Sequence, residues 1–219
     1  MPLLTRWHRW GRTALIGLVS GVVAWFAFAA ARPVPLLDWF DLAIHEAAHL
    51  VAAPLPEVAM FAAGSVAQVA FPLVMAGYFG LRRRDVAAAG FCLVWAGASA
   101  WDVSVYAADA ISQNLPLVGG GQHDWAWLLG HFGALDRTHQ VAGIIESAGG
   151  LIAAAGFGAI ALALLPMRVP TSNPMLAVRA RPVPAADPWL AASRLPFRHD
   201  DGGTQAAGFS VGGGGSGVD

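Results

Sequence analysis

Charged residues are scarce in this chain. Only 12% of its 219 residues are Asp, Glu, Lys or Arg, whereas 56% are hydrophobic, and soluble domains carry roughly twice that charged fraction. The remaining polar residues are too few to cover a globule of this size, so the composition predicts that lipid is the solvent. The formal net charge is −1, which argues against nucleic-acid binding, because that function requires a concentrated basic face. A single cysteine, Cys92, excludes an internal disulfide and a cysteine-based zinc site.

Long apolar segments are what the sequence does contain. They predict an all-α, polytopic membrane protein of four to five transmembrane or re-entrant helices. Pro33, Pro35, Pro54 and Pro56 bound the second segment, because proline has no N–H with which to continue a helix. The predicted segments are 13–30, 39–53, 60–80, 86–110 and 141–165.

The two ends of the chain differ from this pattern. The first apolar segment follows three arginines, as a signal peptide does, but about eighteen apolar residues are enough to span a bilayer. We therefore predict that this segment is retained as a helix. Beyond Pro166, Pro, Ala, Gly and Ser dominate, and such a composition cannot bury enough apolar surface to fold. The sequence predicts a helical membrane domain over 1–170 and a disordered tail over 171–219.

Arginines predict the orientation, because positively charged flanks stay on the cytoplasmic side. One cluster (Arg6, Arg9 and Arg12) precedes the first segment, a second (82–84) follows the third, and Arg168 follows the fifth. If every segment crossed fully, 82–84 would lie outside. The conflict disappears if 39–53 enters and leaves from the outer face as a re-entrant or tilted half-helix. We therefore predict a cytoplasmic N-terminus, with 115–137 outside.

The residues that carry chemistry lie in that second segment, as His45-Glu46-Ala47-Ala48-His49. Histidines at i and i+4 lie one above the other on a helix face, so both imidazoles can bind one metal ion. Glu46 is offset from them and can reach a metal-bound water as a general base. Ionisable residues inside a membrane segment are costly and are usually functional. The pattern predicts a zinc site.

A zinc site needs at least a third protein ligand, and the sequence offers three sources. Asp102 and Asp109 lie seven residues apart in the fourth segment. The pair His123-Asp124 follows three glycines, which let a backbone fold tightly over a site. Hydrogen bonding between helices is the alternative role for the two aspartates, and an interfacial position is the alternative for His123.

Other polar side chains are candidates for orienting a ligand or a substrate. Ser65 and Gln68 lie one turn apart in the third segment, and side chains of this kind hold ligand histidines in many metal sites. Tyr106 belongs to a polar stripe along the fourth segment. Packing contacts between helices are the alternative for all of these groups. The stripe comprises Trp95, Ser99, Asp102, Tyr106 and Asp109.

The motif in a membrane helix, followed by Gly64-Ser65, Gln68 and Pro72, resembles the site-2-protease group of intramembrane zinc metalloproteases. It is more similar still to small bacterial membrane proteins that share the HExxH helix, with a Tyr-x-x-Asp-Ala and a His-Asp-Trp further on, here 106–110 and 123–125. The resemblance implies zinc ligation by His45 and His49, a base at Glu46 and a bacterial inner membrane. The site-2 group takes its third ligand from an Asn-Pro-Asp-Gly-like motif, which this chain lacks.

These observations predict an intramembrane zinc metallopeptidase, with the lipid bilayer and a membrane-embedded or juxtamembrane peptide as its partners. The alternative is a non-catalytic metal-binding membrane protein, or a subunit of an assembly. Glu46 separates the two, because a purely structural metal site needs no carboxylate between its histidines. A di-iron oxygenase is disfavoured, since that class uses several histidine boxes and this chain has one.

Overall fold

The computed structural model of the chain describes residues 2–118 and 121–165, with side chains from residue 10 onward. Within these residues it contains six α-helices, short π- and 3-10-helical turns and no strand. The predicted all-α class is therefore confirmed. The segment 171–219, which was predicted to be disordered, and Arg168 lie outside the described residues.

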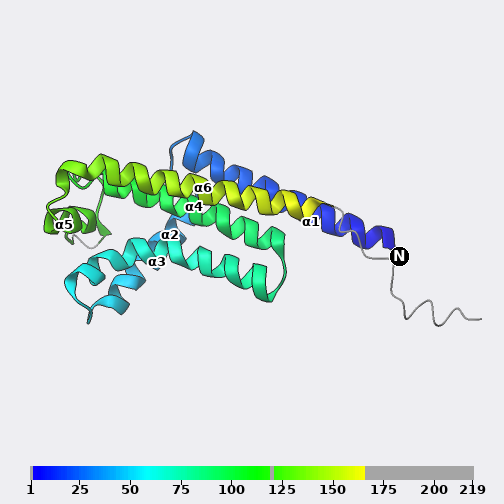
Figure 1. The fold of residues 1–219 in the computed structure, drawn as a ribbon, viewed down its shortest axis with the longest axis horizontal. Helices are drawn as coiled ribbons and strands as arrows, with labels where there is room; N and C mark the ends of the chain where they lie inside the picture. Colours follow the sequence, from blue (N-terminus) through cyan, green and yellow to red (C-terminus); the bar gives the residue numbers. More distant parts are fainter. Residues whose placement is uncertain (1, 119–120, 166–219) are drawn as a thin grey trace, which may run out of the picture. The chain divides into compact units, whose positions relative to one another are not determined.

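Four stretches of helix are long and apolar enough to cross a membrane: Trp10–Ala29, Glu57–Arg82, Val86–Ala108 and Leu135–Leu164. The first and second each continue from an α-helix into a π-helical turn. In chain order the elements are α1 (Pro2–Ala24) with its π turn (Trp25–Ala29), α2 (Leu37–Ala52), α3 (Glu57–Gly77) with its π turn (Tyr78–Arg82), α4 (Val86–Ala108), α5 (Asp124–His131), a 3-10 turn (Leu135–Arg137) and α6 (Thr138–Leu164) (Figure 1).

The helix that carries the HExxH motif, α2, is not among the four candidate spans. Its 16 residues make a helix of roughly 24 Å, shorter than the ~30 Å hydrocarbon core of a bilayer. A four-residue connection folds α3 back along α2. The loop before α5 was predicted, but α5 itself was not, because eight residues are too few for a clear periodic signal.

Helix α4 is the centre of the bundle. Its span is 72% buried, against 22% for each of the other three, because α1, α3 and α6 all pack on it. The contact with α6 is closest, and Figure 1 shows the two helices running side by side. Glycines make this approach possible: a methyl group at Gly97 would lie 2.5 Å from the carbonyl oxygen of Gly149, and one at Gly90 would lie 2.7 Å from that of Gly156.

The described arginine groups meet at one end of the bundle. Arg12 of α1 forms an ion pair with Asp85, which also caps α4 by accepting a hydrogen bond from the Ala88 N–H at 3.1 Å. Burial raises the pKa of Asp85, but the Arg12 guanidinium and the Ala88 N–H outweigh burial and hold the pKa below its ordinary value. In Figure 1, α5 lies at the other end of α4. Arg12 and the turn at 82–85 thus share an end, as the re-entrant arrangement requires.

Candidate metal centre

The two motif histidines lie on the same face of α2, as their spacing predicts. Their ring centroids are 4.8 Å apart, and the rings meet edge to face. His45 is buried and His49 is half-buried. Helix α2 therefore presents two imidazoles toward one point, where α3 and α5 also converge.

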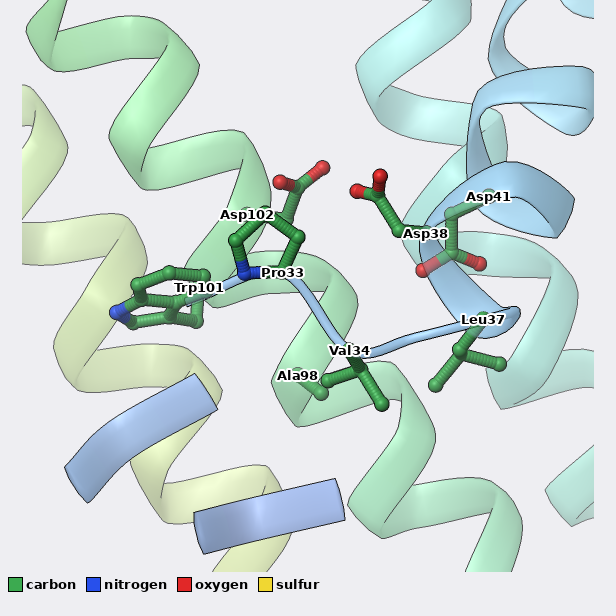
Figure 2. A pocket seen from close by; sticks show the side chains of 8 residues that line it. All are labelled: Pro33, Val34, Leu37, Asp38, Asp41, Ala98, Trp101 and Asp102. Carbon is green, nitrogen blue, oxygen red and sulfur yellow. The ribbon is translucent and has the colours of Figure 1, made fainter. Parts of the chain in front are cut away.

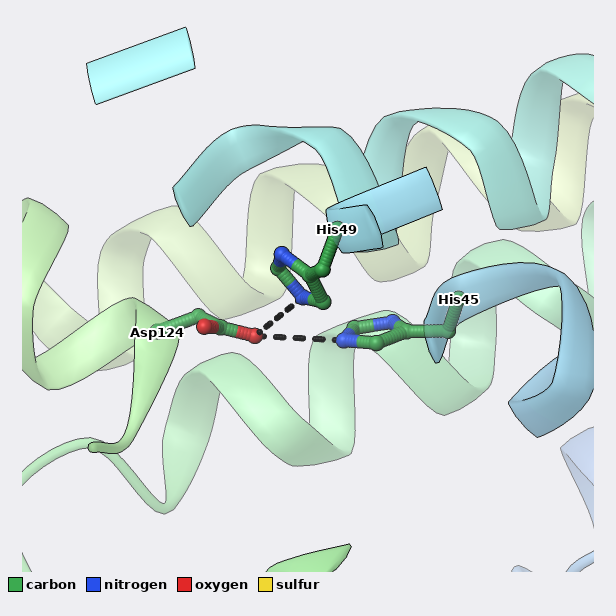
Figure 3. Close-up of side chains that lie close together, drawn as sticks. All are labelled: His45, His49 and Asp124. Atoms are coloured by element: carbon green, nitrogen blue, oxygen red, sulfur yellow. Dashed lines mark hydrogen bonds and ion pairs between the residues drawn. The ribbon is translucent and has the colours of Figure 1, made fainter. Parts of the chain in front are cut away.

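Asp124, the first residue of α5, completes the group. Its Oδ2 atom lies 3.1 Å from the Nε2 atom of His45 and 3.1 Å from that of His49 (Figure 3). The three ligand atoms all lie within 4.8 Å of one another. In a tetrahedral zinc site with bonds of about 2.1 Å, ligand atoms are roughly 3.4 Å apart. The His-His-Asp group can therefore hold a metal ion with little movement.

Space for an ion beside the two histidines is kept by a glycine of α3. A methyl group on Gly64 would lie 2.4 Å from the Nε2 atom of His45 and 2.5 Å from that of His49. Any side chain at this position would occupy the volume that faces both ring nitrogens. The donor set and the space in front of it both fit a metal ion.

The opposite nitrogen of each imidazole has a hydrogen-bond acceptor. His45 Nδ1 lies 3.1 Å from the side-chain oxygen of Gln68, and His49 Nδ1 lies 2.8 Å from the backbone carbonyl oxygen of Met60. Both acceptors require a proton on Nδ1, which leaves the lone pair of Nε2 directed at the ligand group. Ligand histidines in metalloproteins are oriented in this way.

Asp124 is positioned by contacts on both sides of α5. Its N–H donates to the Tyr106 hydroxyl at 3.2 Å, and that hydroxyl lies 3.4 Å from Asp124 Oδ2. The next residue, Trp125, donates its indole N–H to the Ser65 hydroxyl at 3.1 Å. These contacts fix α5 against α3 and α4. Both Tyr106 and Ser65, predicted from the sequence as supporting residues, therefore contact the segment that carries the carboxylate.

Helix α2 is also anchored one turn before His45. The buried Asp41 carboxylate accepts the Trp95 indole N–H at 2.8 Å and the Ser99 hydroxyl at 2.7 Å. A buried carboxylate needs such donors, because leaving it unpaired is costly. The polar stripe of α4 therefore binds the motif helix in place.

The other candidate third ligands lie elsewhere. Asp102 accepts a hydrogen bond from Gln68 at 2.7 Å. Asp109 ends α4 and accepts the N–H groups of Asn114 and Leu115, each at 2.9 Å. Burial raises the pKa of Asp109, but these and the Ser112 hydroxyl outweigh burial and lower the pKa below its ordinary value. Asp109 thus organises the loop that leads to α5.

His123 is fully buried and caps α5 rather than facing the histidine pair. Its Nδ1 atom accepts the Ala126 N–H at 3.3 Å, and its ring stacks on Tyr106 with centroids 4.3 Å apart. Its Nε2 atom lies 3.7 Å from Asp109 Oδ2. Burial lowers the pKa of His123, with the carboxylates of Asp109 and Asp124 opposing that change. His123 therefore supports the turn that delivers Asp124.

Glu46 is half-buried and forms no hydrogen bond or ion pair with any residue that the structure describes. It directly follows His45 on α2, so its side chain points about 100° around the helix from that ligand. The carboxylate is therefore next to the ligand group in the chain and is not a member of it. A group in this position can exchange a proton with a molecule bound beside the histidines.

Three features of the site were not predicted as functional from the residues themselves: the space at Gly64, the Met60 carbonyl and the Asp41 anchor. Gly64 lies four residues before Gln68 on α3, so the i, i+4 spacing places both on one face. That spacing is a signal that could have indicated its role. The Met60 carbonyl has no signal in the sequence, because every residue carries a backbone carbonyl.

No family model, no curated protein and no solved structure matches the chain. The resemblance to site-2 proteases therefore stays a prediction. The described residues form a bundle with four candidate membrane spans. His45, His49 and Asp124 form a group that could bind a metal ion.

Proposed function

We propose that the chain is an intramembrane zinc metallopeptidase that cleaves a membrane-embedded or juxtamembrane peptide. The observation that carries the proposal is the group of His45, His49 and Asp124, with the carboxylate of Glu46 beside it and outside it. Catalytic zinc sites use three protein ligands and keep a fourth position for water or substrate, whereas structural sites use four protein ligands. Among the described residues the group has three members.

Zinc, when bound, lowers the pKa of a water ligand towards neutrality and polarises a carbonyl. The role of Glu46 follows from its place next to His45 on α2. Its carboxylate accepts a proton from the attacking water and passes it to the leaving amine. Gln68 and the Met60 carbonyl would accept a hydrogen bond from Nδ1 of His45 and His49, which leaves each Nε2 atom to hold the zinc ion.

The proposal includes an orientation in a bacterial inner membrane. Arg12 and the arginines at 82–84 share one end of the bundle, and the positive-inside rule assigns that end to the cytoplasm. The N-terminus is then cytoplasmic, and α5 lies toward the outer face. The metal group is reached from the outer half of the bilayer.

This orientation predicts which introduced cysteines an impermeant thiol reagent will label. In a Cys92→Ala background, Asn114→Cys and Asp136→Cys are expected to label in intact cells, because both positions are exposed near α5. Arg83→Cys is expected to label only after the membrane is opened, because it lies at the arginine end. Labelling of intact cells at position 83, with protection at 114 and 136, would reverse the orientation.

The test of the function is a Glu46→Gln substitution. It preserves side-chain size and removes the base, so zinc content is expected to stay near that of the wild type while hydrolysis falls at least about a hundredfold. Zinc is measured on protein purified in detergent, and hydrolysis is followed as membrane-proximal peptide fragments in cells that carry either form. Glu57→Gln, an exposed position at the start of α3, is the matched control and should leave both readouts unchanged.

A non-catalytic metal protein gives a different result. If fragment sets match between wild type and Glu46→Gln, and Glu46→Gln also rescues a deletion phenotype, then the peptidase proposal fails and only metal binding stands. The double variant His45→Ala/His49→Ala tests that remaining part. Retention of stoichiometric zinc in the double variant would place the metal elsewhere and overturn the whole proposal.

A further inference from the structure

Asp102 is a half-buried carboxylate of α4 that has no role in the proposed function. It was one candidate for the third ligand, yet its hydrogen-bond partner is Gln68 and not a histidine. Figure 2 shows the Asp102 carboxylate beside a small pocket between α4 and the start of α2, together with Asp38 and Asp41. Its hydrogen-bonded link to the metal group runs through Gln68.

Three side chains form a continuous line from α4 through α3 to α2. The Gln68 amide nitrogen donates to Asp102 Oδ2 at 2.7 Å, and the Gln68 amide oxygen lies 3.1 Å from His45 Nδ1. A glutamine can present either end of its amide to a neighbour, whereas an ionised carboxylate only accepts hydrogen bonds. Asp102 therefore draws the nitrogen end of Gln68 to itself and turns the oxygen end toward His45.

The amide direction determines which nitrogen of His45 is free. With the Gln68 oxygen facing it, Nδ1 must carry the ring proton, and Nε2 keeps its lone pair toward Asp124 and His49. With the amide reversed, its NH2 group would face Nδ1, which would favour a proton on Nε2 and block that ligand atom. The choice between these states is made on α4, in a residue that never touches the metal group.

We propose that Asp102 is a positioning residue that sets the metal-binding tautomer of His45 by fixing the direction of the Gln68 amide. This inference rests on the proposed metal site, but it does not depend on hydrolysis. It gives a role to a carboxylate in an otherwise apolar helix. It also separates the roles of two carboxylates in the stripe, since Asp109 organises the loop.

The test measures zinc affinity by competition with a chelator, on protein purified in detergent. Asp102→Leu is expected to weaken zinc binding about ten- to a hundredfold, the usual loss when a partner of a ligand histidine is removed. Asp102→Asn should stay within about threefold of wild type, because its carbonyl can still accept from Gln68. Ser104→Ala is the matched control: Ser104 is buried on the same helix, and its hydroxyl donates to the Trp101 carbonyl oxygen one turn earlier in that helix.

Coupling with Gln68 distinguishes positioning from a general structural effect. Adding Asp102→Leu to Gln68→Met should cost no further affinity, because the path to His45 is already broken. In a Gln68→Glu background Asp102→Asn, which is expected to be near neutral in the wild-type background, should instead strengthen zinc binding, since it replaces a repelling carboxylate with an amide that can donate. A general folding defect has no reason to produce that gain in affinity. Both members of this second pair keep polar side chains, so they remain informative if Asp102→Leu does not fold.

Wild-type affinity in a folded Asp102→Leu variant would overturn the inference, and so would additive losses in the Asp102→Leu/Gln68→Met variant or no gain from Asp102→Asn in the Gln68→Glu background. These outcomes differ from failure of the metal site itself. If His45→Ala/His49→Ala binds zinc as the wild type does, the site is wrong. If that double variant loses zinc but the Asp102 variants behave as Ser104→Ala does, only the positioning role is wrong.

Discussion

Replacing Gly64 with alanine is expected to abolish zinc binding while the bundle stays folded. The added methyl group would lie 2.4 Å and 2.5 Å from the two Nε2 atoms that face the metal group, closer than non-bonded contact allows. Moving it away would require α3 to shift from α2, but Gln68 and Met60 of α3 hold both imidazoles. The methyl group therefore competes directly with the ion for the same volume.

The measurement is zinc stoichiometry of the purified variant, beside helical content from circular dichroism. Gly77→Ala is the matched control, because Gly77 ends the same helix and a methyl group there meets nothing within 4 Å. Alanine is also the better helix former by roughly 1 kcal/mol, so loss of zinc in Gly64→Ala alone cannot come from a weakened helix. Full zinc occupancy in Gly64→Ala would show that the ion does not lie between the histidines and α3.

The second large effect is expected at the crossing of α4 and α6. Gly97→Ala would place a methyl group 2.5 Å from the Gly149 carbonyl oxygen and 2.8 Å from the Ala153 side chain. Because the first of these is backbone, no rotamer change can relieve it, and the two helices must separate. We expect a loss of at least about 3 kcal/mol, at the upper end of the usual cost of overpacking.

That loss is measured as a fall in the thermal midpoint of the protein in detergent. Gly150→Ala is the same chemical change next to the crossing on α6, at a position with nothing within 4 Å of the added group. It should leave the midpoint unchanged or raise it slightly. Equal midpoints for Gly97→Ala and Gly150→Ala would contradict the close contact between α4 and α6 at Gly97 and Gly149.

Membrane packing makes this crossing important for the site. Lipid gives no hydrophobic driving force between helices, so close backbone contact and hydrogen bonds carry much of their association. Helix α4 is held on one side by the glycines at α6. Its other side carries Trp95 and Ser99, which donate to Asp41 of α2. It also carries Tyr106, which contacts α5, and Asp102, which contacts α3. Disturbing the crossing therefore disturbs the support of the metal group as well.

The amino-acid sequence by itself determined the features that depend on residues close together in the chain. Four candidate spans follow from runs of apolar residues, because a bilayer rewards any helix of sufficient length and hydrophobicity. The joint placement of His45 and His49 follows from helix geometry alone, since residues four apart share a face. The short length of α2 also follows from the sequence, because prolines bound the helix on both sides.

Only the tertiary structure decided which carboxylate meets the two histidines. Asp102, Asp109 and Asp124 are all of the right chemical type, and no local pattern separates them. The choice is made by the docking of α5, where Trp125 reaches Ser65 and Trp127 stacks on Phe61. These contacts join residues about sixty positions apart, and their geometry depends on how α3, α4 and α5 pack together. The same packing leaves Asp102 to act on His45 through Gln68, because the direction of an amide depends on the neighbour that folding brings to it.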